Sequence, residues 1–227
     1  MLGVLVNAAS IIAGSTLGLI FKKGIPEKIS SSVMKALGIA TFFIGIKSAM
    51  VEVNSLVVVI SLAFGTIIGE TIDIDKYVNE VGKLLKRKFA KKNKDDKFVE
   101  AFVTTSVLYC VGAMVILGGI DAGIKHDYSI YFLKSMLDGF SAVIYSATLG
   151  IGVMFSAISV FIIQGLVVFL SQFLVFLSEN EQMMGAVTCV GNLMVMVIGL
   201  NLMEITKIKI ANLLPAIIIA PIIALFI

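Results

Sequence analysis

Charged residues are scarce in this chain, since only 15% of its 227 residues are Asp, Glu, Lys or Arg. A soluble domain of this size normally has about 25% charged residues, which keep its surface hydrated. Hydrophobic residues make up 59% of the chain, and the mean hydropathy is +1.05. The composition therefore excludes a soluble globular protein and predicts an integral membrane protein.

Histidine and cysteine are also rare. The single histidine, His126, excludes a His-rich metal site of the His-Glu-x-x-His type. Cys110 and Cys189 both fall inside apolar runs, where a cysteine is more often a small packing residue than half of a disulfide. The chain has no Gly-x-Ser-x-Gly nucleophile motif and no phosphate-binding Gly-rich loop followed by Lys. We therefore expect no enzymatic activity, no metal site and no cofactor.

Apolar runs long enough to cross a bilayer, about 20 residues each, recur along nearly the whole chain. They predict an all-α bundle of about eight transmembrane helices. The predicted spans are 2–21, 33–51, 55–72, 98–119, 133–152, 157–177, 184–203 and 210–227. Only small residues separate the fifth and sixth spans, so a single broken helix there, giving seven spans, is the alternative.

Lysine and arginine predict the orientation, because cytoplasmic loops of membrane proteins are enriched in them. Fifteen of these residues fall in loops on one predicted side and three on the other. This distribution places both termini outside. The first apolar run has no basic residue before it and ends at Lys22 and Lys23, which indicates a retained span and not a cleaved signal peptide.

Residues 73–97 predict a basic amphipathic helix on the cytoplasmic leaflet, with nine cations and five anions. One face carries the apolar residues Ile74, Tyr77, Val78, Val81, Leu84, Leu85 and Phe89. The cations expected to contact anionic lipid headgroups are Lys83, Lys86, Arg87 and Lys88. No aromatic-basic motif accompanies them, so a nucleic-acid partner is not expected.

An internal repeat emerges when the sequence is shifted by 154 residues, which places Gly45 on Gly199 and Thr41 on Val195. The shift predicts one transmembrane domain built from a first repeat (1–72), the basic helix (73–97), a central insertion (98–152) and a second repeat (157–227). Five crossings would separate the two copies, so the second copy is inverted. Secondary transporters commonly have this plan, with the site near the midplane.

Glycines at four-residue spacing predict close approach of helix backbones. They occur as Gly14 with Gly18 and as Gly65 with Gly69. Asn212, three residues before Pro215, has the pattern of a helix start in which Asn caps the first turn.

Asp138 is the foremost candidate for a functional residue, because an ionised carboxylate inside a membrane span pairs, stays protonated or binds a cation. Lys47 and Lys134 are its nearest basic candidates. Polar residues follow Asp138 along one helical face, and amides or hydroxyls lie inside three other spans. The predicted solute- or ion-binding residues are Asp138, Ser141, Tyr145, Thr148, Asn7, Thr41 and Asn192.

Five stretches carry a resemblance to a known family: Val6-Asn7-Ala8, residues 110–118, Leu137-Asp138-Gly139-Phe140, residues 148–153 and Asn212-Leu213-Leu214-Pro215-Ala216. In form and order they resemble the bacterial membrane family of unknown function that includes YqgA and YdfK. The resemblance implies a protein of the bacterial cytoplasmic membrane and assigns no substrate. Asp138 falls within the family's Asp-x-Phe stretch and Asn212 within its Asn-x-Leu-Pro stretch.

These observations favour a transporter or channel for a small solute or cation, acting as a homodimer. Asp138 would bind a cation or carry a proton, and the hydroxyls and amides would replace water around the solute. The alternative is a non-transporting scaffold or sensor that acts through the basic helix. A lipid-processing enzyme is a weaker third reading, since histidine and arginine are scarce.

Overall fold

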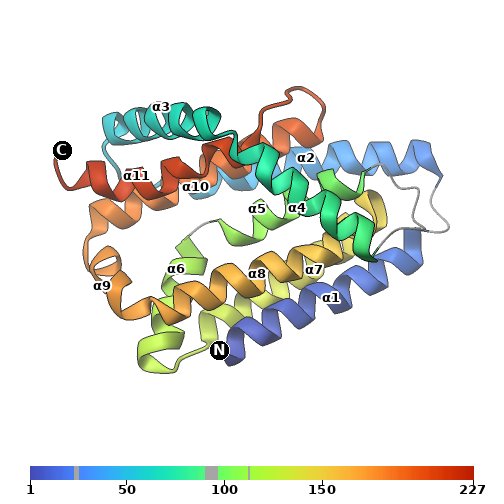
Figure 1. The fold of residues 1–227 in the computed structure, drawn as a ribbon, viewed down its shortest axis with the longest axis horizontal. Helices are drawn as coiled ribbons and strands as arrows, with labels where there is room; N and C mark the ends of the chain where they lie inside the picture. The colour runs from blue at the N-terminus through green and yellow to red at the C-terminus, as the bar shows by residue number, and fades with distance from the viewer. Residues whose placement is uncertain (23–25, 90–96, 112) are drawn as a thin grey trace. The chain divides into compact units, whose positions relative to one another are not determined.

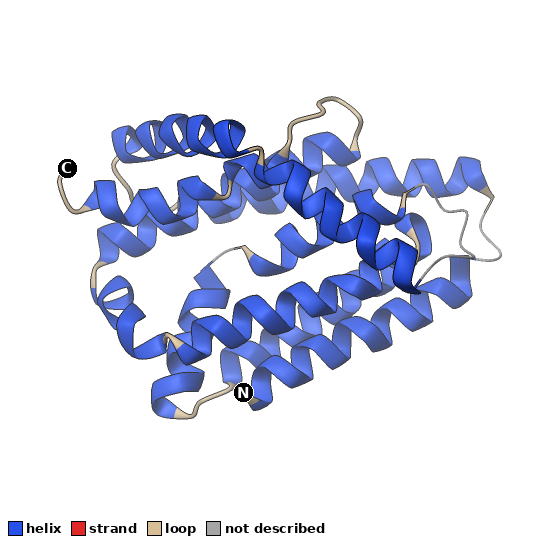
Figure 2. Ribbon diagram, viewed as in Figure 1, coloured by secondary structure: helices blue, strands red, loops and turns tan. Residues whose placement is uncertain are grey.

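The computed structural model describes residues 1–22, 26–89, 97–111 and 113–227, and their regular structure is helical (Figure 2). The helices, in chain order, are α1 (Leu2–Lys22), α2 (Glu27–Ala49), α3 (Ser55–Ile72), α4 (Ile74–Phe89), α5 (Phe98–Cys110), α6 (Ala113–Ile120), the π-helical turn η1 (Asp121–Lys125), α7 (Ser129–Leu149), α8 (Gly152–Phe169), α9 (Ser171–Glu179), α10 (Glu181–Leu202), the 3₁₀ turn η2 (Ile210–Leu213) and α11 (Pro215–Ala224) (Figure 1). The all-α prediction is confirmed.

Five of the described helices are long and apolar enough to cross a membrane: α1, α2, α3, α8 and α10. A sixth span is obtained if α5 and the helix that follows it, bent by 55°, are counted as one. This number is smaller than the eight spans predicted. Two predicted spans fall short, because α7 carries Lys134 and Asp138 within its 21 residues and α11 has only 10 residues.

The predicted weak point between the fifth and sixth spans is a turn between two separate helices. Helix α7 ends at Leu149 and α8 begins at Gly152. Gly150 has φ 93°, a left-handed conformation that glycine adopts without steric penalty. The break lies instead within the predicted fourth span, where α5 ends at Cys110 and α6 begins at Ala113.

The chain forms two compact units. Unit 1 comprises Met1–Val33, Val78–Cys110 and Met114–Phe173. In it α1, α7 and α8 lie alongside one another (Figure 1). Gly14 faces the backbone of Gly139 and Gly18 faces that of Val143, so α1 and α7 run parallel in close contact. Glycine allows this contact because an added Cβ at either position would overlap a carbonyl oxygen of α7.

Unit 2 comprises Met34–Tyr77, Val111–Ala113 and Leu174–Ile227. Helices α3 and α11 pack antiparallel, with Gly65 against Ala216 and Gly69 against the backbone of Asn212. The prediction that Gly14, Gly18, Gly65 and Gly69 mark sites of close helix packing is confirmed.

Asn212 does not cap its own helix, so that prediction is wrong. Its side-chain Oδ1 accepts a hydrogen bond of 2.7 Å from the backbone N–H of Asp75, in the first turn of α4. Asn212 lies in η2, and α11 begins only at Pro215. Beside this contact, the Lys209 ammonium donates a hydrogen bond of 3.2 Å to Asp73, which lowers the pKa of that carboxyl.

Replacing Gly14 with alanine is expected to destabilise the protein by about 1–3 kcal/mol, because the added methyl group must separate α1 from α7. Gly165→Ala is the matched control, since a Cβ there meets only the Met1 side chain at 3.5 Å. Denaturant unfolding in detergent micelles measures both variants. Equal stability of the two would contradict the proposed role of close α1–α7 packing.

Candidate functional site

A buried ion pair lies on α7. The side chains of Lys134 and Asp138 are one helical turn apart, and the residues are only 6% and 7% exposed. Lys134 Nζ lies 2.9 Å from Oδ2 and 3.1 Å from Oδ1 of Asp138. Of the two lysines that the sequence offered as partners, Lys134 is therefore the one that pairs. The pair lies near the middle of α7, Ser129–Leu149.

Two side-chain amides extend this pair to neighbouring helices. Asn7 of α1 donates from Nδ2 to Asp138 Oδ2 at 2.9 Å and to Oε1 of Gln164, on α8, at 3.2 Å. Asn7 and Gln164 are fully buried. These four residues, Asn7, Lys134, Asp138 and Gln164, are called the Asp138 cluster below. The cluster joins α1, α7 and α8 through polar side chains.

Two polar atoms of the Asp138 cluster lack a hydrogen-bond partner among the described residues. They are Asn7 Oδ1, an acceptor, and Gln164 Nε2, a donor. A buried polar atom without a partner costs about 1–3 kcal/mol, and in folded proteins such atoms are usually met by water or a ligand. The cluster therefore has an unused acceptor and an unused donor beside a pair of opposite charges.

Two hydroxyls lie beside the cluster, Ser141 on the next turn of α7 and Tyr109 on α5. Ser141 Oγ donates to the Tyr109 hydroxyl at 3.2 Å and to the backbone carbonyl of Asp138 at 2.9 Å. Tyr109, at the end of α5, is 1% exposed. Further along the predicted stripe, Tyr145 is buried, and Thr148 donates to backbone carbonyls of its own helix at 3.0 and 3.1 Å. The polar network thus includes Asp138 and Ser141, while the Thr148 hydroxyl is used within the helix.

The remaining predicted binding residues, Thr41 and Asn192, belong to unit 2. Asn192 Nδ2 donates to the backbone carbonyl of Thr188 at 2.8 Å and to that of Ser48 at 3.2 Å, which links α10 to α2. Thr41 is buried in the same unit. Asn7 and Asp138 are thus in contact in unit 1, and the other two residues lie in unit 2.

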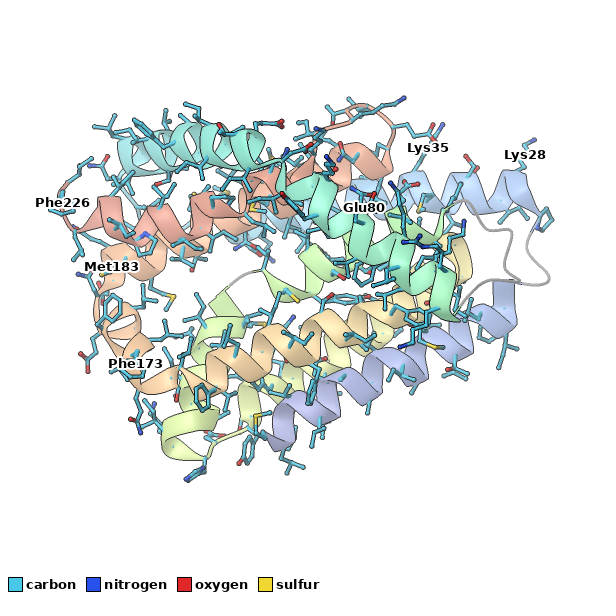
Figure 3. The ribbon with its side chains drawn as sticks, viewed as in Figure 1. Lys28, Lys35, Glu80, Phe173, Met183 and Phe226 are labelled. Carbon is cyan, nitrogen blue, oxygen red and sulfur yellow. The ribbon has the colours of Figure 1, made fainter. Side chains whose placement is uncertain are left out.

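Helix α4 contains the four cations expected to contact lipid. Lys83, Arg87 and Lys88 are exposed and Lys86 is half-buried. Lys83 pairs at 2.8 Å with Glu80, which Figure 3 labels on this helix. Tyr77, Val81 and Leu84 are 64%, 50% and 55% exposed and form an apolar stripe at helical spacing. On the opposite side Gly82 is buried beside Val99 and Phe102 of α5. Residues 90–96 of the predicted helix lie outside the described part of the chain.

Gln164 was missed by sequence reasoning. It is the one side-chain amide in the apolar helix Gly152–Phe169, and that isolation was the available signal. A side-chain amide in a membrane span needs a hydrogen-bond partner, and Asn7 of α1 is that partner for Gln164. In the described residues, no group of three or more His, Cys, Asp or Glu side chains could hold a metal ion.

Comparison with known proteins gives one family. The family model described as "Protein of unknown function (DUF554)" matches residues 2–225. The "Uncharacterized membrane protein YdfK" of Bacillus subtilis (strain 168) is 31% identical over 227 residues, which cover 98% of this chain and 95% of the relative. The "Uncharacterized protein YqgA" of Escherichia coli (strain K12) is 31% identical over 223 residues, which cover 97% and 94%. No solved structure matches the chain significantly.

Breaking the buried pair with one substitution is expected to cost about 3–5 kcal/mol, because the remaining charge loses its counter-ion in a dry interior. Lys134→Met and Asp138→Leu test the single losses. The double variant should be destabilised by far less than the sum, since no buried charge is left. Unfolding of all four proteins forms a double-mutant cycle, and additive losses would show that the two charges do not interact.

Proposed function

The chain belongs to the DUF554 family of proteins of unknown function, and from this premise we propose that it transports a small solute or cation across a membrane through the Asp138 cluster. One observation carries the proposal: a charged pair buried between three helices, beside an acceptor and a donor that have no partner in the part of the chain that the structure describes. Ionisable groups inside a membrane are costly and commonly mark solute or ion pathways.

The proposed transporter has eight spans, two of them being α7 and the η2–α11 segment. Contacts in unit 2 support inverted copies. A shift of 154 moves the span of α2, Glu27–Ala49, onto 181–203, and α10 is Glu181–Leu202. Gly38 packs against Gly199, and Gly45 packs against Asn192. The same shift converts 38 to 192 and 45 to 199, so the two contacts are exchanged, as an approximate two-fold axis requires.

Helix direction supports the same plan. In the contacts of α2 with α10 and of α3 with α11, residue numbers rise along one helix as they fall along the other, so each pair is antiparallel. Antiparallel packing of corresponding segments is what an inverted repeat produces. Inverted-repeat transporters bind solute near the midplane, where discontinuous helices line the site. The break between α5 and α6 follows Tyr109, which accepts a hydrogen bond from Ser141 beside the cluster.

The remaining parts of the proposal come from the sequence. They are a location in the bacterial cytoplasmic membrane, both termini outside and a homodimer. Ser141, Tyr145 and Thr148 complete the proposed pathway lining in unit 1, and the binding roles of Thr41 and Asn192, which belong to unit 2, stay predictions from the sequence.

Asp138→Asn is expected to abolish transport, because the neutral amide cannot attract a cation or hold the Lys134 ammonium. Purified protein in liposomes is screened for flux of protons, monovalent cations and small polar solutes. Asp121→Asn is the matched control, since Asp121 is a half-buried carboxylate paired with Lys125 in the η1 turn, outside the cluster. Flux that is unchanged in Asp138→Asn would contradict the role of the cluster.

A second candidate function is suggested by α4, a sensor that reads the charge of the inner leaflet. The exposed apolar stripe of Tyr77, Val81 and Leu84, with cations on the same helix, is suited to insertion among anionic headgroups. The α4 helix is also tied at its start to η2 through Asn212, which offers a route from lipid contact to the last span.

Lys83→Gln with Arg87→Gln is expected to reduce the thermal stabilisation that phosphatidylglycerol gives relative to phosphatidylcholine in nanodiscs. Each exposed cation near an anionic surface contributes about 1 kcal/mol of attraction. The control removes the same charge from α2 through Lys28→Gln with Lys35→Gln, two exposed lysines that Figure 3 labels on α2. Equal effects of the two double variants would leave only a general charge effect and contradict a specific role of α4.

A further inference from the structure

We propose that the Asp138 cluster recognises a zwitterion, a small solute with one ammonium and one carboxylate as in an amino acid. This inference rests on the transport function proposed above and names the chemical class of its solute. It follows from the number, sign and position of the polar groups in the cluster.

The charge of the cluster sets the charge of the solute. Lys134 and Asp138 contribute one positive and one negative charge, both buried and in contact. Helices α1 and α8 add no other charge to the pair, since Leu2–Phe21 of α1 and Gly152–Phe169 of α8 contain no Asp, Glu, Lys or Arg. From α5, Tyr109 and Cys110 are the titratable neighbours of the pair. A solute with a net charge would leave an unbalanced charge in the low-dielectric interior, whereas a zwitterion leaves the site neutral.

A zwitterion can also replace the contact that it disrupts. When Lys134 and Asp138 separate, the solute carboxylate accepts hydrogen bonds from the Lys134 ammonium and the solute ammonium donates to the Asp138 carboxylate. Two ion pairs then stand in place of one. Lysine suits this exchange because its charge is carried on a flexible four-carbon chain. A cation alone would leave Lys134 without a counter-ion, and an anion alone would do the same to Asp138.

The two unused amide atoms match the same solute. Asn7 is bonded through Nδ2 to Asp138, so an ammonium at Asp138 comes within reach of the unpartnered Asn7 Oδ1. Gln164 Nε2 is a donor with no partner among the described residues, and a carboxylate oxygen can accept from it. The amide acceptor therefore pairs with the solute ammonium, and the amide donor pairs with the solute carboxylate. Both amide side chains, Asn7 and Gln164, are fully buried. A neutral polar solute would use these two atoms but would make no use of the charges.

Four probes on one carbon skeleton separate the charge classes: glycine (zwitterion), glycinamide (cation), N-acetylglycine (anion) and N-acetylglycinamide (neutral). Binding to the full-length protein in nanodiscs is measured by calorimetry and by thermal stabilisation. β-Alanine and γ-aminobutyrate, added as longer zwitterions, vary the distance between the charges. We expect the best zwitterion to bind at least tenfold more tightly than the cation, anion or neutral probe.

The double variant Lys134→Gln with Asp138→Asn removes both charges and leaves no unpaired ion, so it should fold and lose zwitterion binding by at least tenfold. Gln164→Leu should weaken the binding of the same zwitterion. Ser159→Ala is the control, because Ser159 bonds Ser106 on α5 and lies outside the cluster. Its affinity should equal that of the unmodified protein.

Several results would overturn the zwitterion assignment: tighter binding of the cation, anion or neutral probe, no binding of any zwitterion, or undiminished zwitterion binding in the folded double variant. Flux of protons or another solute that requires Asp138, without zwitterion binding, would overturn the assignment alone and leave the transport function standing. Absence of flux for every solute in the liposome screen would contradict the transport function itself.

Discussion

The ion pair between Lys134 and Asp138 is the interaction that unit 1 has to accommodate. Lys134 and Asp138 are only 6% and 7% exposed, so each charge depends on the other and on polar groups from neighbouring helices. Asn7 supplies that support from α1, and Gln164 extends it to α8. The positions of three helices are therefore coupled to one charged pair. The two amide atoms beside it that have no hydrogen-bond partner among the described residues make the cluster a candidate site.

Close packing is the condition under which this polar contact forms. Gly14 and Gly18 let α1 approach the backbone of α7, and Asn7, two turns earlier on α1, can then reach Asp138 with a short side chain. The same device recurs in unit 2, where Gly38 and Gly45 bring α2 against α10. In a membrane, apolar side chains gain little by leaving lipid, so backbone approach and interhelical hydrogen bonds have larger roles in association.

Several features could be predicted because they depend on local composition. The all-α class, the membrane location and the close-packing glycines follow from apolar runs and residue spacing. Spacing along one helix also made Lys134 a candidate partner of Asp138, four residues away. The number of spans was harder to predict, because α7 is long enough to cross a membrane but contains polar residues that lower its mean hydropathy. The predicted capping role of Asn212 was wrong, because the hydrogen-bond partner of its side chain is the backbone N–H of Asp75, 137 residues away in sequence.

The sequence by itself determined that this is a helical membrane protein of the DUF554 family, with a carboxylate inside an apolar run. Only the tertiary structure decided what meets that carboxylate. Asn7 and Gln164 are 157 residues apart, and no local pattern predicts their contact. Tertiary packing also left one acceptor and one donor of the cluster without a partner among the residues that the structure describes. The physical reason is that propensity and hydropathy act over neighbouring residues, whereas hydrogen-bond partners in a dry interior are set by which helices pack together.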